Sequence, residues 1–175
     1  MNNLRFNVLA GMVLAVVVTR LLPHPPNFTP VAAIALFGGA SFSNRRAAFF
    51  VPLLGLLLSD LVLGFSAITP VVYACFALIT CIGLLLRQRQ SMGTVTAAAV
   101  VSVLLFFVLS NFGTWCLSGL YPKTSTGLLQ CYTAALPFMR NMLISNLLYT
   151  ALLFGGLALA ERRFTRLREP GLAAA

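Results

Sequence analysis

The sequence predicts an all-α membrane protein with six transmembrane helices and with both its N- and C-termini in the cytoplasm. Of its 175 residues, 59% are hydrophobic and only 9% are charged, whereas roughly 25% are charged in an ordinary soluble domain. The mean hydropathy is +0.94. A chain this short has no interior large enough to hide so much apolar surface, which excludes a soluble globular protein.

Six apolar runs form one compact domain over residues 1–175. Four are near the roughly 20 residues that cross ~30 Å of hydrocarbon. The second run is short, which leaves a re-entrant segment open as an alternative to a span. The sixth is long and is expected to tilt or to extend beyond the bilayer. The predicted spans are residues 4–22, 30–42, 47–63, 69–86, 93–117 and 131–160.

Basic residues set the predicted orientation. The chain has 12 Lys and Arg against 3 Asp and Glu, a net charge of +9. In a soluble protein this charge would indicate nucleic acid as a partner, but here its position indicates topology, and no nucleic acid partner is expected. With six crossings and a cytoplasmic N-terminus, only Arg20, Lys123 and Arg140 fall outside, in accord with the positive-inside rule. The inner side receives Arg5, Arg45, Arg46, Arg87, Arg89, Arg162, Arg163, Arg166 and Arg168.

The first run could instead be a secretory signal peptide, because Arg5 precedes an apolar stretch. No small-residue cleavage site precedes the string LLPHPP, which favours a retained helix. A retained first helix makes the protein a multi-pass membrane protein in this reading.

The sequence also limits the chemistry. One His and scattered Cys residues give no HExxH motif and no bis-histidine haem site. There is no GxxxxGK[ST] phosphate loop, so any ATP would have to be hydrolysed by another protein.

Polar residues gather in the outer half of the predicted spans. Such groups are costly in lipid and usually face a bundle interior or a water-filled cavity, although any one of them could simply join two helices. Asp60 is the only membrane-level acid, because Glu161 and Glu169 fall in the predicted cytoplasmic tail. Arg140 is its expected partner, in a structural ion pair or in one that also lines a ligand site. The outer residues expected to converge on a pocket are Asp60, Tyr73, Cys75, Asn111, Trp115, Arg140 and Asn141.

Two outer loops are expected to cover this pocket. The Pro-rich loop 23–30 is rigid and carries His24 and Asn27, which either meet a ligand or cap the next span. The loop over residues 118–130, with Lys123, reads either as a lid or as a solvated connector.

The four cysteines have separate interpretations. Cys81 is expected to be a small buried hydrophobe. Cys116 and Cys131 flank the second loop and could form a disulfide, which the sequence leaves open. Cys75 shares its level with Asp60 and Tyr73. A bare metal ion is not expected, but a thiolate at Cys75 could ligate a metal held in an organic molecule.

Four strings resemble a family of small six-span bacterial membrane proteins. They are RLLPHPPNFTPVAAIALFGGA (20–40), LLLSDLVLGF (56–65), SNFGTW (110–115) and YPKTSTGLLQCYTAALPF (121–138). This family is similar to the substrate-binding S components of energy-coupling factor (ECF) type ABC transporters, in particular the cobalamin-binding, BtuM-like branch. The resemblance covers residues 20–155.

The resemblance implies a six-helix S component that captures a vitamin at its outer face. It implies that Cys75 ligates the cobalt of bound cobalamin, with Cys81 as a weaker candidate, and that His24 and Asp60 line the pocket. S components generally dock onto a transmembrane coupling protein through small residues of the first helix, which here would be Gly11 and Ala15.

The expected function is therefore uptake of cobalamin or a related corrinoid, with an ECF transmembrane coupling protein and two ATPases as partners and no cofactor of its own. Tyr73 and Trp115 would offer flat faces to a macrocycle, while Asn111 and Asn141 would bind its amide groups. The alternatives are an S component for a flavin- or thiamine-type vitamin, a membrane enzyme using Cys75 on the axial ligand of cobalt, and a scaffold protein without a pocket.

Overall fold

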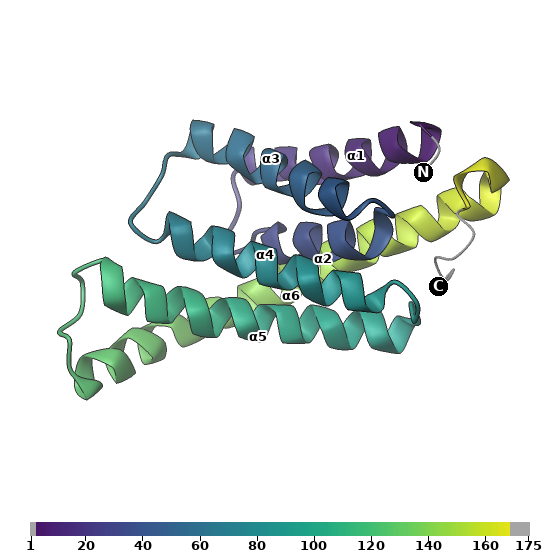
Figure 1. Cartoon of the computed structure of the whole chain (residues 1–175). Helices are drawn as coiled ribbons and strands as arrows, with labels where there is room; N and C mark the ends of the chain where they lie inside the picture. Colours follow the sequence, from purple (N-terminus) through teal and green to yellow (C-terminus); the bar gives the residue numbers. More distant parts are fainter. Residues whose placement is uncertain (1–2, 169–175) are drawn as a thin grey trace.

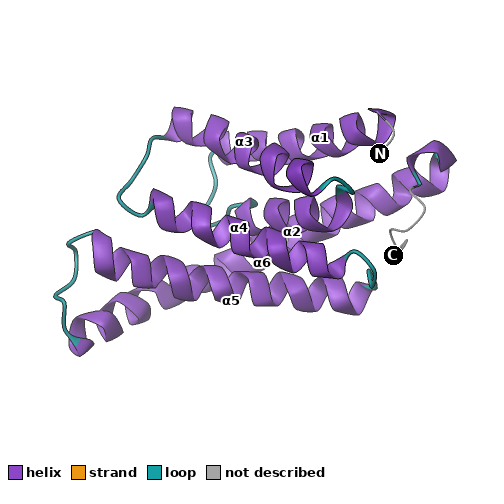
Figure 2. Cartoon of the chain, viewed as in Figure 1, coloured by secondary structure: helices purple, strands orange, loops and turns teal. Residues whose placement is uncertain are grey.

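The computed structural model describes residues 3–168, and this part of the chain is all-helical, as the sequence predicts (Figures 1 and 2). Five of its helices are long and apolar enough to cross a membrane; the remaining one, α2, is an apolar helix of 11 residues. Glu169 and the tail after it lie outside the described residues. The α-helices are α1 (Asn3–Val18), α2 (Val31–Ser41), α3 (Arg45–Leu63), α4 (Thr69–Leu86), α5 (Met92–Leu117) and α6 (Ser125–Arg163), with short 3-10 turns η1 (Thr19–Leu21) and η2 (Thr165–Leu167).

Successive helices alternate in direction, so the two described ends of the chain lie at the same end of the bundle (Figure 1). Arg5 of α1 joins them by an ion pair with Glu161 of α6 and a hydrogen bond to the carbonyl of Leu167. We call this end the arginine end and the opposite one the loop end.

The second apolar run passes from the loop end toward the arginine end. Arg20, in η1, contacts Ser59 near the loop end of α3, whereas Phe42, after α2, contacts Arg87 at the arginine end of α4. The second apolar run therefore begins and finishes at opposite ends of the bundle. The helix itself rises only about 16 Å, so the irregular segment 22–30, which contains a turn at residues 25–28, covers the rest of the distance.

Helix α2 lies at the centre of the bundle, and every one of its residues is buried. Glycine allows its neighbours to approach closely. A Cβ added at Gly39 would lie 2.8 Å from the Cα of Gly83 on α4, and one added at Gly38 would collide with Pro52 of α3. Close backbone approach at small residues is how helices gain packing energy in lipid, where no hydrophobic force drives them together.

Polar groups satisfy only one end of this buried helix. At its C-terminal end, Arg87 donates from Nε to the carbonyl of Gly39 (2.9 Å) and from Nη1 to that of Ser43 (3.0 Å). Gln90 donates to the carbonyl of Ala40 at 3.1 Å. The carbonyls of Gly39 and Ala40 belong to the last turn of α2, which has no internal donors for them, and a cation also complements the negative end of the helix dipole.

Helix α6 has 39 residues and a rise of about 58 Å, longer than the bilayer core, as expected. It begins at Ser125, where the side chain of Thr124 accepts from the backbone N–H of Gly127. The connection expected over residues 118–130 is therefore only residues 118–124, and the predicted span 131–160 lies within a longer helix. Thr124, Ser125 and Thr126 read as loop residues in the sequence, although Thr124 caps the N-terminus of this helix.

The α2–α4 contact predicts that Gly83→Ala destabilises the protein, because the added methyl group must push two backbones apart. We expect a loss of about 1–3 kcal/mol, measured by denaturant unfolding in detergent micelles. Gly155→Ala is the matched control, since a Cβ there meets nothing within 4 Å, and it should be neutral or slightly stabilising. Equal stability of the two variants would contradict the close approach.

Candidate functional site

A buried ion pair lies at the loop end of the bundle. Asp60, in the last turn of α3, accepts from Nη2 of Arg20 at 2.9 Å, and the two side chains are 11% and 12% exposed. Arg20 also donates to Ser59, whose hydroxyl in turn donates to the carbonyl of Leu56 at 2.8 Å. Two partially satisfied charges are thereby held together away from bulk solvent.

The predicted partner of Asp60 was wrong. Arg140 is exposed on α6 and makes no ion pair within residues 3–168. The reason is helix adjacency: α1 packs on α3, whereas α6 does not contact α3. The sequence did contain the correct signal, because Arg20 precedes the first outer loop and therefore lies at the same end as Asp60.

Two buried polar atoms beside this ion pair lack hydrogen bonds in the described chain. They are the hydroxyl oxygen of Tyr73 on α4 and Nε of Arg20. The Tyr73 hydroxyl lies close enough to Asp60 and Arg20 to interact electrostatically with both. Buried polar atoms are normally hydrogen-bonded, which makes this cluster suited to an additional polar partner.

Cys75 follows on α4 and is completely buried. Helices α2 and α4 run in the same direction with Gly39 packed on Gly83. Val31 precedes Gly39 on α2 by as many residues as Cys75 precedes Gly83 on α4. Cys75 therefore lies at about the depth of the α2 N-terminus. Cys81 is instead exposed on the outside of the bundle, and its expected burial was wrong. Its outward position makes it a poor ligand for anything held inside.

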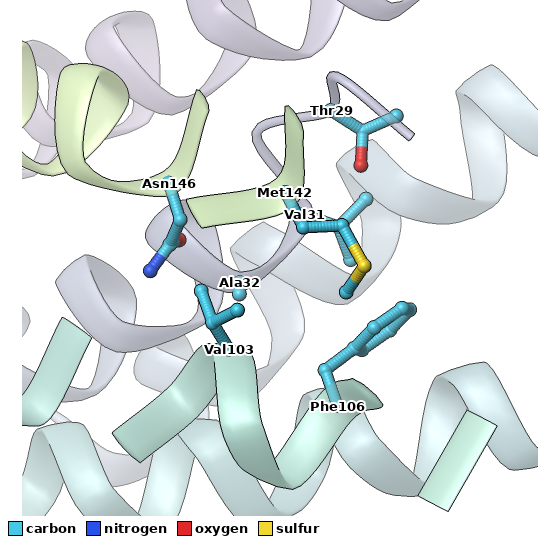
Figure 3. Close-up of a pocket in the computed structure, with 7 residues that line it drawn as sticks. All are labelled: Thr29, Val31, Ala32, Val103, Phe106, Met142 and Asn146. Carbon is cyan, nitrogen blue, oxygen red and sulfur yellow. The ribbon is translucent and has the colours of Figure 1, made fainter. Parts of the chain in front are cut away.

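A small cavity lies at the N-terminus of α2 (Figure 3). Its volume is about 20 Å³, enough for one water molecule. No side chain caps α2, and the first turn donates its earliest backbone bond from Ile34 to Pro30. The N–H groups before Ile34 are therefore left without helical acceptors. The cavity is lined by Thr29, Val31, Ala32, Val103, Phe106, Met142 and Asn146.

Asn146 of α6 is 1% exposed and supplies an acceptor to this cavity. Its Nδ2 donates to the carbonyl of Ala99 at 2.8 Å, whereas its Oδ1 has no partner in the described chain. The amide orientation is fixed because a carbonyl can only accept. Orphan donors from α2 and an orphan acceptor from Asn146 therefore lie together. Asn146 is not among the predicted site residues, because the sequence cannot reveal which amide lacks a partner.

The Pro-rich segment is fastened to α6 by two hydrogen bonds. Asn141 donates to the carbonyl of Pro26 at 3.0 Å, and Ser145 donates to that of Thr29 at 3.2 Å. His24 is exposed beside the carbonyl of Pro25, and Asn27 is exposed with a φ of 59°. Asn141 thus holds the loop, while His24 and Asn27 contact neither the ion pair nor the cavity.

The residues at the α5–α6 turn satisfy one another. Trp115 donates from its indole to the carbonyl of Pro122 at 2.8 Å, and Lys123 binds the Trp115 carbonyl and lies 5.4 Å from its ring centroid. The side-chain amide of Asn111 donates to the backbone carbonyl of Phe107 in the same helix, and the backbone carbonyl of Asn111 accepts from the Cys131 thiol at 3.4 Å. Cys116 and Cys131 are both free thiols, so the disulfide that the sequence left open does not form.

The remaining predicted residues lie on α1. Gly11 and Ala15 are exposed, and a Cβ at Gly11 would meet no atom within 4 Å. Within residues 3–168 no three His, Cys, Asp or Glu side chains come together as a metal site.

We expect loss of the Arg20–Asp60 pair to lower the free energy of unfolding much more than loss of Arg140. Removing one partner of a buried pair leaves an uncompensated charge, so Arg20→Gln should cost about 3–5 kcal/mol of unfolding free energy. The exposed control Arg140→Gln should stay within about 0.5 kcal/mol of the parent. Chemical denaturation in micelles measures both. A larger loss for Arg140→Gln than for Arg20→Gln would show that the assigned pairing is wrong.

Comparison with known proteins gives a family but no activity. A search of curated proteins and a search of solved structures each find no match. A family profile matches residues 1–168, almost the whole chain. The protein therefore belongs to the DUF6580 family, which is described as a family of unknown function.

Proposed function

We propose that this protein is the substrate-binding membrane subunit of an ECF-type vitamin transporter, and that its substrate is cobalamin or a related corrinoid. The observation that carries the proposal is a set of polar groups that lack hydrogen bonds in the described chain, divided between the ion pair at the loop end and the cavity at the start of α2. They are the Tyr73 hydroxyl and Nε of Arg20 at the ion pair, and Oδ1 of Asn146 and the first N–H groups of α2 at the cavity, with Cys75 at about the depth of the α2 N-terminus.

These groups complement a corrinoid chemically. A primary amide side arm can accept from the α2 N–H groups and donate to Oδ1 of Asn146. The Cys75 thiolate is a soft ligand suited to cobalt, and the corrin supplies the metal's other in-plane ligands. The polar cluster at Arg20, Asp60 and Tyr73 offers both donors and acceptors to further side arms.

Ligand entry requires the outer segment to move. The cavity at α2 holds about one water, and Cys75 has no exposed surface. Only two hydrogen bonds, from Asn141 and Ser145, hold the Pro-rich segment on α6. In this proposal the segment swings away to admit the vitamin, and the rigid prolines let it move as a unit.

The proposed orientation places the arginine end in the cytoplasm of a bacterial cell, with the loop end outside the inner membrane and six crossings in all. Nine arginines collect at the end where α1 begins and α6 finishes, which supports this orientation through the positive-inside rule. The open surface around Gly11 and Ala15 would dock the transmembrane coupling protein, and its two ATPases would drive delivery.

The complete burial of Cys75 favours one alternative, an S component for another vitamin in which this thiol only packs. A flavin- or thiamine-type ligand could use the same polar groups without cobalt. An enzyme acting through Cys75 on the axial ligand would require turnover of that ligand as well as binding.

Cobalamin binding predicts a distinctive visible spectrum. Protein purified in detergent from cells grown with cobalamin should carry a corrinoid with an altered axial ligand, and Cys75→Ala should lose that alteration. Cys81→Ala is the matched control on the same helix and should behave as the parent, because Cys81 faces outward.

The possible failures of that experiment separate the claims. A colourless protein that also fails to bind added cobalamin contradicts the corrinoid proposal, and a co-purified flavin or thiamine favours the alternative vitamin. A spectrum unaffected by Cys75→Ala removes only the assigned cobalt ligand. Catalytic release of the axial group identifies an enzyme.

The orientation predicts labelling by a thiol reagent that does not cross membranes. In a Cys-free background on intact spheroplasts, Ala67→Cys, in the exposed α3–α4 loop, should react, whereas Arg46→Cys, exposed at the start of α3, should not. Arg46 is a better probe than Arg87, which holds the α2 carbonyls. The reverse labelling pattern would invert the orientation.

A further inference from the structure

A second, larger recess lies far from the polar cluster, between the first turns of α5 and the second half of α6. Its volume is about 450 Å³, within the roughly 300–1,000 Å³ range of ligand sites. Figure 1 shows these two segments diverging toward the arginine end. The lining side chains include Met92 and Val95 from α5, and Leu147, Gly155, Ala158 and Arg162 from α6. We call this recess the α5–α6 groove.

The dimensions of the groove match one leaflet of a bilayer. From Leu147 to Arg162 the helix rises about 22 Å, which is half of the ~40–45 Å thickness of a bilayer with its headgroups. Small residues on α6, Ala151, Gly155 and Ala158, line the middle of the groove beside Phe154, and a Cβ added at Gly155 would meet no atom within 4 Å. A long, thin apolar chain therefore fits along α6.

The described residues at the end of the groove carry positive charge that forms no ion pair. Arg162 is exposed and makes no ion pair among residues 3–168. Both acidic residues within 3–168 already form ion pairs, Glu161 with Arg5 and Asp60 with Arg20. Arg163 and Arg166, which follow, are exposed as well. An occupant with an apolar body and an anionic head at this end complements both features.

We propose that the α5–α6 groove binds one anionic phospholipid from the leaflet at the arginine end. An acyl chain lies along Gly155 and Ala158, and the phosphate pairs with Arg162. The inference rests on the bundle spanning a membrane and is independent of the vitamin bound at the opposite end. Each arginine near anionic headgroups strengthens lipid attraction by about fivefold.

Native mass spectrometry of the detergent-purified protein tests the site with two added lipids of identical acyl chains, phosphatidylglycerol and phosphatidylcholine. We expect the parent protein to retain one phosphatidylglycerol in preference to phosphatidylcholine. Arg162→Gln should lower this preference about fivefold, and Gly155→Phe, which fills the groove, should reduce retention of both lipids.

Matched controls separate the site from general effects. Arg46→Gln removes another exposed arginine at the same end, and Ala134→Phe adds a ring to an exposed position in the first half of the same helix. Both should bind lipid as the parent does. Equal retention of the two lipids by the parent, or equal losses in the variants and their controls, would overturn the proposal. So would a change in subunit number without loss of lipid after Gly155→Phe, because it would identify a second copy as the occupant.

Discussion

The central constraint of this structure is a short helix buried in the middle of a membrane bundle. Helix α2 is too short to cross a bilayer, and lipid cannot hydrogen-bond its ends. Direct contact of Gly39 with Gly83 fixes its depth, and Arg87 satisfies its last carbonyls. The opposite end is left with free N–H groups that no side chain caps. The polar cavity beside Asn146 is therefore a direct consequence of how this helix is held.

The acidic residues Glu161 and Asp60 hold the first helix in the bundle through ion pairs. Arg5 pairs with Glu161 of α6 at one end of α1, and Arg20 follows its other end and pairs with Asp60 of α3. Buried ion pairs add little net stability but penalise other arrangements strongly, because a lone charge in lipid is costly. Between these two attachments the surface at Gly11 is open. A helix anchored at both ends can present its middle to a partner without leaving the bundle.

The sequence predicted the depth of several candidate-site residues along their helices, but it predicted few of their contacts. The run lengths and the arginine distribution placed Asp60, Tyr73 and Cys75 at one end, and the structure brings the first two together. Asp60 was assigned to Arg140, because both lie at the same depth on different helices. Depth follows from a count of residues along one helix, but partners depend on which helices are neighbours, and α6 does not contact α3.

The sequence by itself determined an all-helical protein with the approximate limits of its apolar runs, because hydrophobicity must persist for as long as a segment remains in lipid. It also determined the end at which arginines collect. Only the tertiary structure decided which polar atoms lack partners. Asn146 is one asparagine among several in the sequence, and it becomes distinctive because it is buried and α2 begins beside it without a cap. The α5–α6 groove likewise exists only through the divergence of two helices, each of which is an ordinary apolar run in the sequence.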